Sequence, residues 1–331
     1  MCITLFFRCW LLAALTISVH AESGIRIGII GLDSSHCLRF AELFNDPAHP
    51  DHISGGRIVA AYAGGSPDVE LSRTRVEAFT AQLRDQYRIP ILDTIAEVSS
   101  RSDALMILSV DGRAHLTEAR AACRPGQPVF IDKPLAGSLA EAIALVRHAR
   151  SAGSPIFSSS VLRYSTSATR ILTSDSGELR GAISYGPAPT EPHVPDFFFY
   201  GIHPTEALFT VLGRGCETVS RIHAEDTDVI AATWSGGRTG VVYGLRGVKR
   251  GYGLTAFGTK AVVEDRSPID FLPLARRVMA FLRTGEPPLP IETTLEILAF
   301  MEAADESKRL GGAPVNIRDV FARHEDTADH L

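Results

Sequence analysis

A lysine and an aspartate stand where a short buried strand is expected to end. Residues 128–131 predict this strand, and Asp132, Lys133 and Pro134 follow it directly. Ligands of an open parallel sheet bind beyond the carboxyl ends of its strands. A lysine there would place its ammonium beside a reacting hydroxyl or carbonyl, and low dielectric would ease the loss of its proton, which suits proton relay. The alternative is a loop lysine in solvent, against which Pro134 argues because it fixes the chain at that point.

A second chemistry-bearing stretch lies near the N-terminus, at residues 25–36. The isoleucine-rich run 25–30 predicts a strand buried on both faces. Gly31 permits a sharp turn, and Ser34 and Ser35 are suitable N-cap residues for a following helix. Free N–H groups at a helix N-terminus point outward, so this turn is a candidate anion site.

The turn departs from the dinucleotide fingerprint G-x-G-x-x-G. Aligned on Gly31, the six residues are Gly-Leu-Asp-Ser-Ser-His, and Leu32 follows the only matching glycine. Asp33 stands where a pyrophosphate needs close backbone approach, and His36 where helix and strand pack closely. The stretch therefore fits either a nucleotide site or an ordinary strand–turn–helix with a polar cap, and His36 either a ligand contact or a packing residue.

The second expected strand, residues 57–62, lacks the acidic residue that binds ribose hydroxyls in the dinucleotide pattern. A glycine pair and Ser66 follow it, with Arg73 and Arg75 further along. Serine and arginine there would favour a 2′-phosphate, and hence NADP. The alternative is a plain glycine turn and a solvated helix face.

Strands and helices alternate through the first half of the chain, which predicts βαβ units with right-handed crossovers in a parallel sheet. After residue 175 strands follow one another, which predicts a mostly antiparallel sheet. The expected first-half elements are helices at 36–45, 68–88, 112–123 and 138–150 and strands at 89–92, 104–110, 128–131 and 155–160. The expected second-half elements are strands at 178–185, 217–224, 228–235, 239–245 and 252–257, a hairpin turn at 236–237, and helices at 202–212, 268–283 and 293–310.

Several short motifs together resemble the glucose–fructose oxidoreductase, inositol dehydrogenase and MocA family (Gfo/Idh/MocA). Asp132-Lys133-Pro134 matches the E-K-P signature of that family, and His115, Ala119 and Gly126 match the stretch that precedes this signature. Arg163-Tyr164 matches its R-[FY] element, and Gly201-Ile202-His203 matches the G-x-H of its D-x-G-x-H motif. Residues 292–309 match its closing helix. The resemblance covers most of residues 24–320.

The resemblance implies an α/β fold with a Rossmann-type doubly wound parallel sheet over residues 24–155. An α+β domain with an open, mostly antiparallel sheet would follow over 156–290. Residues 291–331 would form a helix returning to the first domain, and a tail. It also implies NAD or NADP, hydride transfer to or from the hydroxyl carbon of a sugar, polyol or glycoside, and a homo-oligomer formed through the second-domain sheet.

The resemblance also implies roles for individual residues. Lys133 would assist proton transfer and His203 would be the acid/base histidine, because imidazole titrates near working pH. Arg163, Tyr164 and Glu206 would line the substrate cleft. The cofactor crevice would be lined by Gly31, Leu32, Asp33, Ser34, Ser35, His36, Ser66, Ser109, Asp111, His115, Asp132 and Lys133. No metal site is expected.

The chain departs from the family at positions that matter for this interpretation. Phe199 stands where the family has an acid four residues before the histidine, so Glu206 or Asp196 would have to orient His203. Asp33 would have to turn away from the phosphates or meet a cation, because unpaired like charges in a desolvated pocket cost several kcal/mol. The alternatives are a hydrogen-bonded interdomain role for His203 and a structural role for His115.

Composition is that of a soluble globular protein: 331 residues, 21% charged, 45% hydrophobic and a formal charge of −5, with no basic tract that would suggest nucleic acid. The N-terminus differs. An apolar run at 9–19 and a Val-His-Ala site predict a signal peptide over 1–21, and hence a periplasmic or secreted protein with no membrane span after cleavage. A misassigned start or an uncleaved anchor is the alternative. Cys37, Cys123 and Cys216 then remain, too widely spaced for a disulfide framework, and are expected as free thiols.

Export and a dissociable nicotinamide cofactor conflict, because that cofactor is made and recycled in the cytosol. Either a tightly retained cofactor or none would resolve the conflict. The first hypothesis is therefore an exported dehydrogenase. The alternatives are an NAD-dependent enzyme that cleaves glycosides through transient oxidation, and a non-catalytic sugar- or nucleotide-binding protein, which the departures at Asp33, His36 and Phe199 would explain.

Overall fold

The first half of the chain forms a five-stranded parallel sheet in the order β2-β1-β3-β4-β5. The computed structural model describes residues 24–249 and 251–331, so the predicted signal peptide lies outside the described residues. The strands are β1 (Ile25–Ile30), β2 (Gly56–Tyr62), β3 (Ala104–Ile107), β4 (Val129–Ile131) and β5 (Ile156–Phe157). The strand order reverses at β1, which is the switch point where such sheets bind ligands. The predicted Rossmann-type sheet is confirmed.

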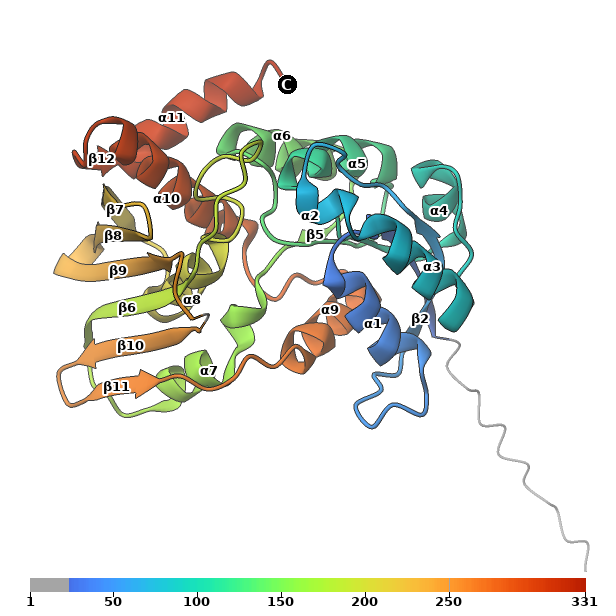
Figure 1. Ribbon diagram of the computed structural model, residues 1–331, viewed down its shortest axis with the longest axis horizontal. Helices are drawn as coiled ribbons and strands as arrows, with labels where there is room; N and C mark the ends of the chain where they lie inside the picture. The colour runs from blue at the N-terminus through green and yellow to red at the C-terminus, as the bar shows by residue number, and fades with distance from the viewer. Residues whose placement is uncertain (1–23, 250) are drawn as a thin grey trace, which may run out of the picture.

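Helices cover both faces of this sheet, with α5 and α6 above it and α1 and a helix from the second half, α9 (Leu272–Thr284), below it in the view of Figure 1. They are α1 (Ser35–Asn45), α2 (Glu70–Arg73), α3 (Val76–Gln86), α4 (Ile95–Arg101), α5 (His115–Ala122) and α6 (Leu139–Ala152). The helix predicted over 68–88 is wrong in one respect: it breaks at residues 74–75. The strand predicted at 89–92 is only a single bridge between Ala61 and Ile91, because Pro90 has no N–H to extend the ladder.

The second half forms a seven-stranded sheet in the order β11-β10-β6-β9-β8-β7-β12. Only β6 and β9 pair in parallel, so the prediction of a mostly antiparallel sheet is confirmed. Its strands are β6 (Leu179–Pro187), β7 (Cys216–His223), β8 (Thr227–Trp234), β9 (Arg238–Leu245), β10 (Gly253–Gly258), β11 (Val262–Asp265) and β12 (Val315–Asn316). Gly236 and Gly237, with φ of 77° and 75°, turn the chain from β8 into β9, as predicted.

Five helices complete the second half: α7 (Thr166–Thr173), α8 (Ile202–Leu212), α9 (Leu272–Thr284), α10 (Ile291–Arg309) and α11 (Ile317–Ala328). The two C-terminal helices join the halves, because α10 packs against α6, α8 and β7, and α11 against α6 and β7 (Figure 1). The sequence interpretation missed α7, α11, β11 and β12. No helix among residues 24–249 and 251–331 is long and apolar enough to span a membrane.

A buried ion network ties the second sheet to α10 and to the loop before α8. The guanidinium of Arg221 on β7, fully buried, lies 2.8 Å from Asp228, 3.0 Å from Asp196 and in contact with Asp305 of α10. Asp196 also accepts a hydrogen bond from Lys308 at 2.6 Å. Asp196 is therefore engaged here, and the prediction that it might orient His203 is wrong.

We expect Asp228→Asn to remove an acid-sensitive part of the stability. Burial alone would raise the pKa of Asp228, but hydrogen bonds from Arg221, Arg246 and His223 lower it to about 2. A carboxyl with a depressed pKa stabilises the fold above its unfolded pKa of about 3.9, and that contribution, about 2 kcal/mol, is lost as pH falls toward 2. Urea unfolding at pH 6 and pH 3 should show the gap between wild type and variant closing at low pH. Asp175→Asn, at an exposed pair with Lys260, should leave that pH dependence unchanged; a constant gap would contradict the prediction.

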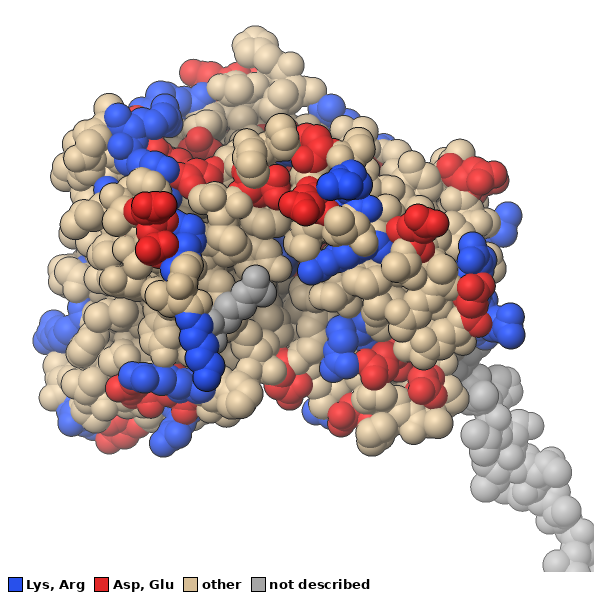
Figure 2. Space-filling model, viewed as in Figure 1, with Lys and Arg blue, Asp and Glu red and all other residues tan. Residues whose placement is uncertain are grey.

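The three cysteines of the described chain are free, as predicted: Cys37 and Cys216 are buried and Cys123 is half-buried. Positive and negative side chains are interspersed over the face shown in Figure 2, with no continuous basic surface on that face.

Candidate active site

Lys133 and His203, far apart in the sequence, meet across the ring of Tyr200. Lys133 follows β4 and is 6% exposed, and its Nζ lies 5.7 Å from the centre of the Tyr200 ring. The rings of Tyr200 and His203 are 5.5 Å apart, with His203 in the first turn of α8 and 7% exposed. An ammonium group from the first half and an imidazole from the second thus face one site at the carboxyl end of the parallel sheet.

A serine holds His203 in place of the family's acid. The Nδ1 atom of His203 lies 2.7 Å from Oγ of Ser160, just beyond β5. Burial, together with the charges of Lys133 and His36, keeps the pKa of His203 well below its ordinary value, and the carboxylate of Asp132 only partly opposes this. The imidazole is therefore neutral at pH 7.

Glu206 supports His203 through the serine loop. Its carboxylate accepts hydrogen bonds from Ser159 Oγ at 2.7 Å, from the Ser160 N–H at 2.6 Å and from Arg163 Nε at 2.6 Å. Glu206 thereby fixes Ser160, which in turn faces His203. Of the two acids that the sequence offered as orienting groups, only Glu206 reaches this neighbourhood, and it acts through Ser160.

Arg163 and Tyr164 line a cavity of about 450 Å³ whose other walls include Thr210, Pro273 and Arg277. The Arg277 guanidinium lies 5.9 Å from the centre of the Tyr164 ring. Burial and the nearby Glu206 carboxylate raise the pKa of Tyr164 to about 12. Lys133 and His203 are not among the residues lining this cavity. Arg163 connects to His203 through Glu206 and Ser160.

His36 contributes a second imidazole to the site. Its Nδ1 lies 2.7 Å from Asp132 Oδ2 and its ring 4.9 Å from that of Phe271. Asp132 is buried at the end of β4, and its other oxygen accepts the N–H of Lys133 at 2.9 Å. Burial alone would raise the pKa of Asp132, but His36 and Lys133 lower it below the ordinary range.

The side chain of Asp33 points into the protein. This is the orientation that phosphate binding at this turn would require. One carboxylate oxygen accepts the N–H of Val110 at 2.9 Å and the other the hydroxyl of Ser72 at 2.6 Å. Leu32 is buried, and Ser34 caps the N–H of His36 at 3.2 Å. Ser35, at the N-terminus of α1, stays exposed. The helix is thus exposed at Ser35, while the N–H groups of His36 and Cys37 bond to Ser34 and the acid of the turn is bonded inside the protein.

Gly31→Ala should destabilise the fold strongly. The backbone φ of Gly31 is +83°, and an added Cβ would collide with the side chain and backbone of Ser109. Strain and overpacking together should lower the free energy of unfolding by about 2–5 kcal/mol. The measurement is urea unfolding followed by circular dichroism.

Gly126→Ala is the matched control. Gly126 also has a positive φ, +73°, but no described atom lies within 4 Å of an added Cβ. Gly126→Ala should lower the free energy of unfolding by only about 1–2 kcal/mol, the cost of a left-handed backbone conformation for alanine. Equal losses for the two variants would contradict the close approach of Ser109 to the turn.

The remaining predicted cofactor residues are mostly engaged inside the protein. His115 faces two backbone oxygens, of Ser109 at 2.9 Å and of Leu135 at 3.3 Å, which fits its structural alternative. Ser109 donates to Glu118 at 2.6 Å. Asp111 caps the turn at Arg113. The Ser66 N–H bonds to Ser72 Oγ at 2.7 Å. Sequence reasoning missed Ser72, Glu118 and Ser160, because a single hydroxyl or carboxyl group has no spacing signature of its own.

These residues fit a phosphate-bearing nicotinamide cofactor at two places. The N-terminus of α1, exposed at Ser35, would take the phosphates, since the Asp33 carboxylate is buried and bonded elsewhere. The site around Lys133 and His203 would take the reactive end. Among residues 24–249 and 251–331, no group of His, Cys, Asp or Glu side chains is arranged to hold a metal ion.

A comparison of the amino-acid sequence with family models identifies the family of the first half. Residues 25–159 match the model of an oxidoreductase family with an NAD-binding Rossmann fold, named GFO_IDH_MocA. These residues belong to the Gfo/Idh/MocA family. The resemblance drawn from the E-K-P-like motif is therefore confirmed for this Gfo/Idh/MocA domain, which includes Lys133, Asp132 and His36. No curated protein sequence matches the chain.

Solved structures of similar fold extend beyond the Gfo/Idh/MocA domain to both halves. Scyllo-inositol dehydrogenase from Lactobacillus casei, with NAD(H) and scyllo-inositol bound, has a TM-score of 0.73 at 14% identity, covering 89% of this chain and 99% of that one. Myo-inositol dehydrogenase from the same organism, with NAD(H) and myo-inositol, has 0.68 at 14%, covering 88% and 96%. An Agrobacterium radiobacter oxidoreductase with NAD⁺, L-tartaric acid and magnesium has 0.71 at 17%, covering 90% and 99%. At these identities the likeness shows the shared fold.

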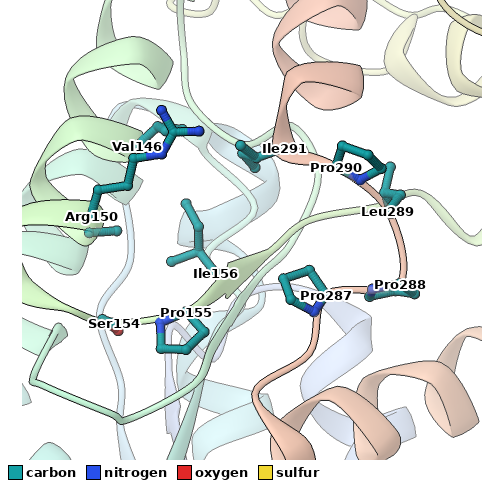
Figure 3. Close-up of a pocket in the computed structure, with 11 residues that line it drawn as sticks. Val146, Arg150, Ser154, Pro155, Ile156, Pro287, Pro288, Leu289, Pro290 and Ile291 are labelled. Carbon is teal, nitrogen blue, oxygen red and sulfur yellow. The ribbon is translucent and has the colours of Figure 1, made fainter.

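A separate apolar cavity lies away from this site, between α6 and the proline-rich link that precedes α10 (Figure 3). It measures about 430 Å³ and is lined by aliphatic and proline side chains such as Val146, Ile156 and Pro287. Its one charged lining residue, Arg150, already pairs with Glu292 at 2.7 Å. This cavity therefore offers no group for chemistry.

Proposed function

We propose that this chain is an NAD(P)-dependent oxidoreductase that transfers hydride to or from the hydroxyl carbon of a sugar, polyol or glycoside. The meeting of Lys133 and His203 across Tyr200, at the carboxyl end of the Gfo/Idh/MocA sheet, carries the proposal. A bound nicotinamide would supply the hydride acceptor or donor. The polyols bound by the inositol dehydrogenases of similar fold support this substrate class.

The chain's own residues would bind, orient and shield the substrate. Lys133 would donate a hydrogen bond to the reacting oxygen and stabilise the negative charge that develops on it. His203, neutral and fixed by Ser160, would hold the same hydroxyl in one orientation. The aromatic ring of Tyr200 would cover the apolar face of the ring of a sugar or inositol and exclude water.

Spectroscopy on the purified native protein tests the proposal. Absorbance and mass spectrometry should reveal bound nicotinamide, or added NAD⁺ or NADP⁺ should be reduced at 340 nm with members of an inositol, hexose and glycoside panel. Protein that binds sugars but neither holds nor binds NAD(H) or NADP(H) would instead be a non-catalytic binding protein. Glycoside cleavage that needs the cofactor but gives no net reduction would identify the transient-oxidation alternative.

Export and self-association are separate proposals. We propose that residues 1–21 are removed on export to the periplasm or beyond, and that copies of the chain associate through the second sheet. Exposed apolar side chains on its strands, Ile222, Tyr243 and Val262, support the second. Sequencing the mature N-terminus tests export. Light scattering of wild type and Ile222→Lys tests association; a monomeric wild type would refute it.

A further inference from the structure

The imidazole of His36 forms a dyad with a buried carboxylate. Nδ1 of His36 lies 2.7 Å from Asp132 Oδ2, so the Nδ1–H tautomer is the one that donates to the acid. In that tautomer Nε2 carries the lone pair. Nε2 has no hydrogen-bond partner among the residues that the structure describes, and the side chain is 15% exposed. His36 is thus held as a base whose free nitrogen can still be reached.

The ring of His36 is fixed in place by its neighbours. The Phe271 ring lies 4.9 Å away and the Phe40 ring 6.5 Å away, edge-on. Its backbone N–H bonds to Ser34 Oγ, which anchors the first turn of α1. A base that packs against two aromatic rings and is bonded at one nitrogen loses little freedom when a substrate proton arrives, which favours proton transfer.

The two imidazoles of the site differ in what stands behind them. His36 has the carboxylate of Asp132 at Nδ1, which would stabilise a positive charge on the ring. His203 has only the hydroxyl of Ser160, and Lys133 adds a positive charge nearby, so His203 stays neutral. The charged groups around this pair of rings are Asp132 and Lys133, from the end of β4, with the Glu206 carboxylate behind Ser160.

We propose that His36, oriented by Asp132, is the residue that accepts and returns the substrate proton, in place of His203. In the oxidation direction the substrate gives its C–H electron pair, as hydride, to the nicotinamide of the proposed function. Its O–H bond breaks, the proton goes to Nε2 of His36, and a C=O bond forms. Asp132 balances the imidazolium without taking the proton. The inference rests on the proposed function and assigns one role within it.

His36→Gln and Asp132→Asn test the assignment in the intact chain. Glutamine keeps a polar group of similar length but cannot accept and hold a proton. His36→Gln should lower kcat by about 10²-fold or more, change the KM for the cofactor less than threefold and abolish the acidic limb of the kcat/KM pH profile. His49→Gln removes another imidazole–carboxylate pair, 3.4 Å from Glu42 on the surface, and should leave all three unchanged.

A spectroscopic readout on the cofactor-free protein tests the dyad without turnover. Long-range ¹H–¹⁵N spectra should show His36 as the Nδ1–H tautomer, assigned by its absence in His36→Gln. That preference should vanish in Asp132→Asn. A neutral wild-type ring that carries its proton on Nε2 would overturn the proposal on its own.

The kinetic outcomes separate this inference from the proposed function. Wild type with no oxidoreductase activity would refute the proposed function, and the measured tautomer of His36 would still test the His36–Asp132 dyad. Active wild type with an unchanged pH profile in His36→Gln would refute His36 as the base. A raised cofactor KM at constant kcat would also refute it, because His36 would then be a phosphate or ribose contact.

Discussion

Lys133→Met should lower kcat by about 10²–10⁴-fold in a protein that still folds. The lysine is almost fully buried, and its ammonium group lies over the Tyr200 ring, next to His203. Methionine fills a similar volume and keeps the apolar stem, so the loss would come from the missing positive charge beside the developing oxyanion. Steady-state kinetics at saturating cofactor, with circular dichroism as a check of folding, measure the effect.

The control is Lys260, a lysine on the surface of the protein. Lys260 is exposed and forms an ion pair with Asp175 at 2.9 Å. Lys260→Met should leave kcat and KM within twofold of wild type. If Lys133→Met kept more than a tenth of wild-type kcat, Lys133 would be a packing residue, and the site around Tyr200 would have to be reassigned.

Arg221→Met should lower the free energy of unfolding by about 3–5 kcal/mol, because it removes the buried cation that three carboxylates share. The guanidinium is fully buried and contacts Asp228, Asp196 and Asp305. It also lies 5.1 Å from the centre of the Phe197 ring, just before the segment that carries Tyr200 and His203. Urea unfolding measures the loss, and kcat should fall as well if this segment loosens.

Two further variants sharpen this prediction. Arg180, exposed and paired with Glu178 at 3.0 Å, provides the control: Arg180→Met should change stability by less than about 0.5 kcal/mol. Adding Asp305→Asn to Arg221→Met should recover part of the loss, since Asp305 is left without the arginine that it contacts. Asp228 would still pair with Arg246, and Asp196 with Lys308. No recovery would mean that the loss comes from packing against Phe197 rather than from charge.

The sequence predicted the two sheets because they depend on strong local patterns, and the family resemblance implied the meeting of Lys133 and His203. Alternating strands and helices determine the first sheet, and a lysine after a buried strand must emerge at its carboxyl edge. The prediction failed where a contact depends on distant partners. Ser160 and His203 are 43 residues apart, and nothing in either local pattern marks the pair.

The same limit explains the error at Asp196. Asp196 lies close to His203 in the sequence and was therefore a candidate partner. Its carboxylate instead pairs with Arg221 on β7 and Lys308 on α10. The short helix α2 is a related case, because Ser72 bonds to Asp33 across 39 residues and the helix breaks soon afterwards.

The division of the site between the two sheets has a consequence for recombination. Lys133, Asp132 and His36 come from the first half, whereas Tyr200 and His203 come from the second, and α10 and α11 bind the halves together by packing on α6 and β7. Neither half is a transferable module. A chimaera carrying this Rossmann half on a foreign partner would keep Lys133 and the His36–Asp132 pair. It would lose the Tyr200–His203 segment that completes the site, unless the graft also brought that segment and both C-terminal helices.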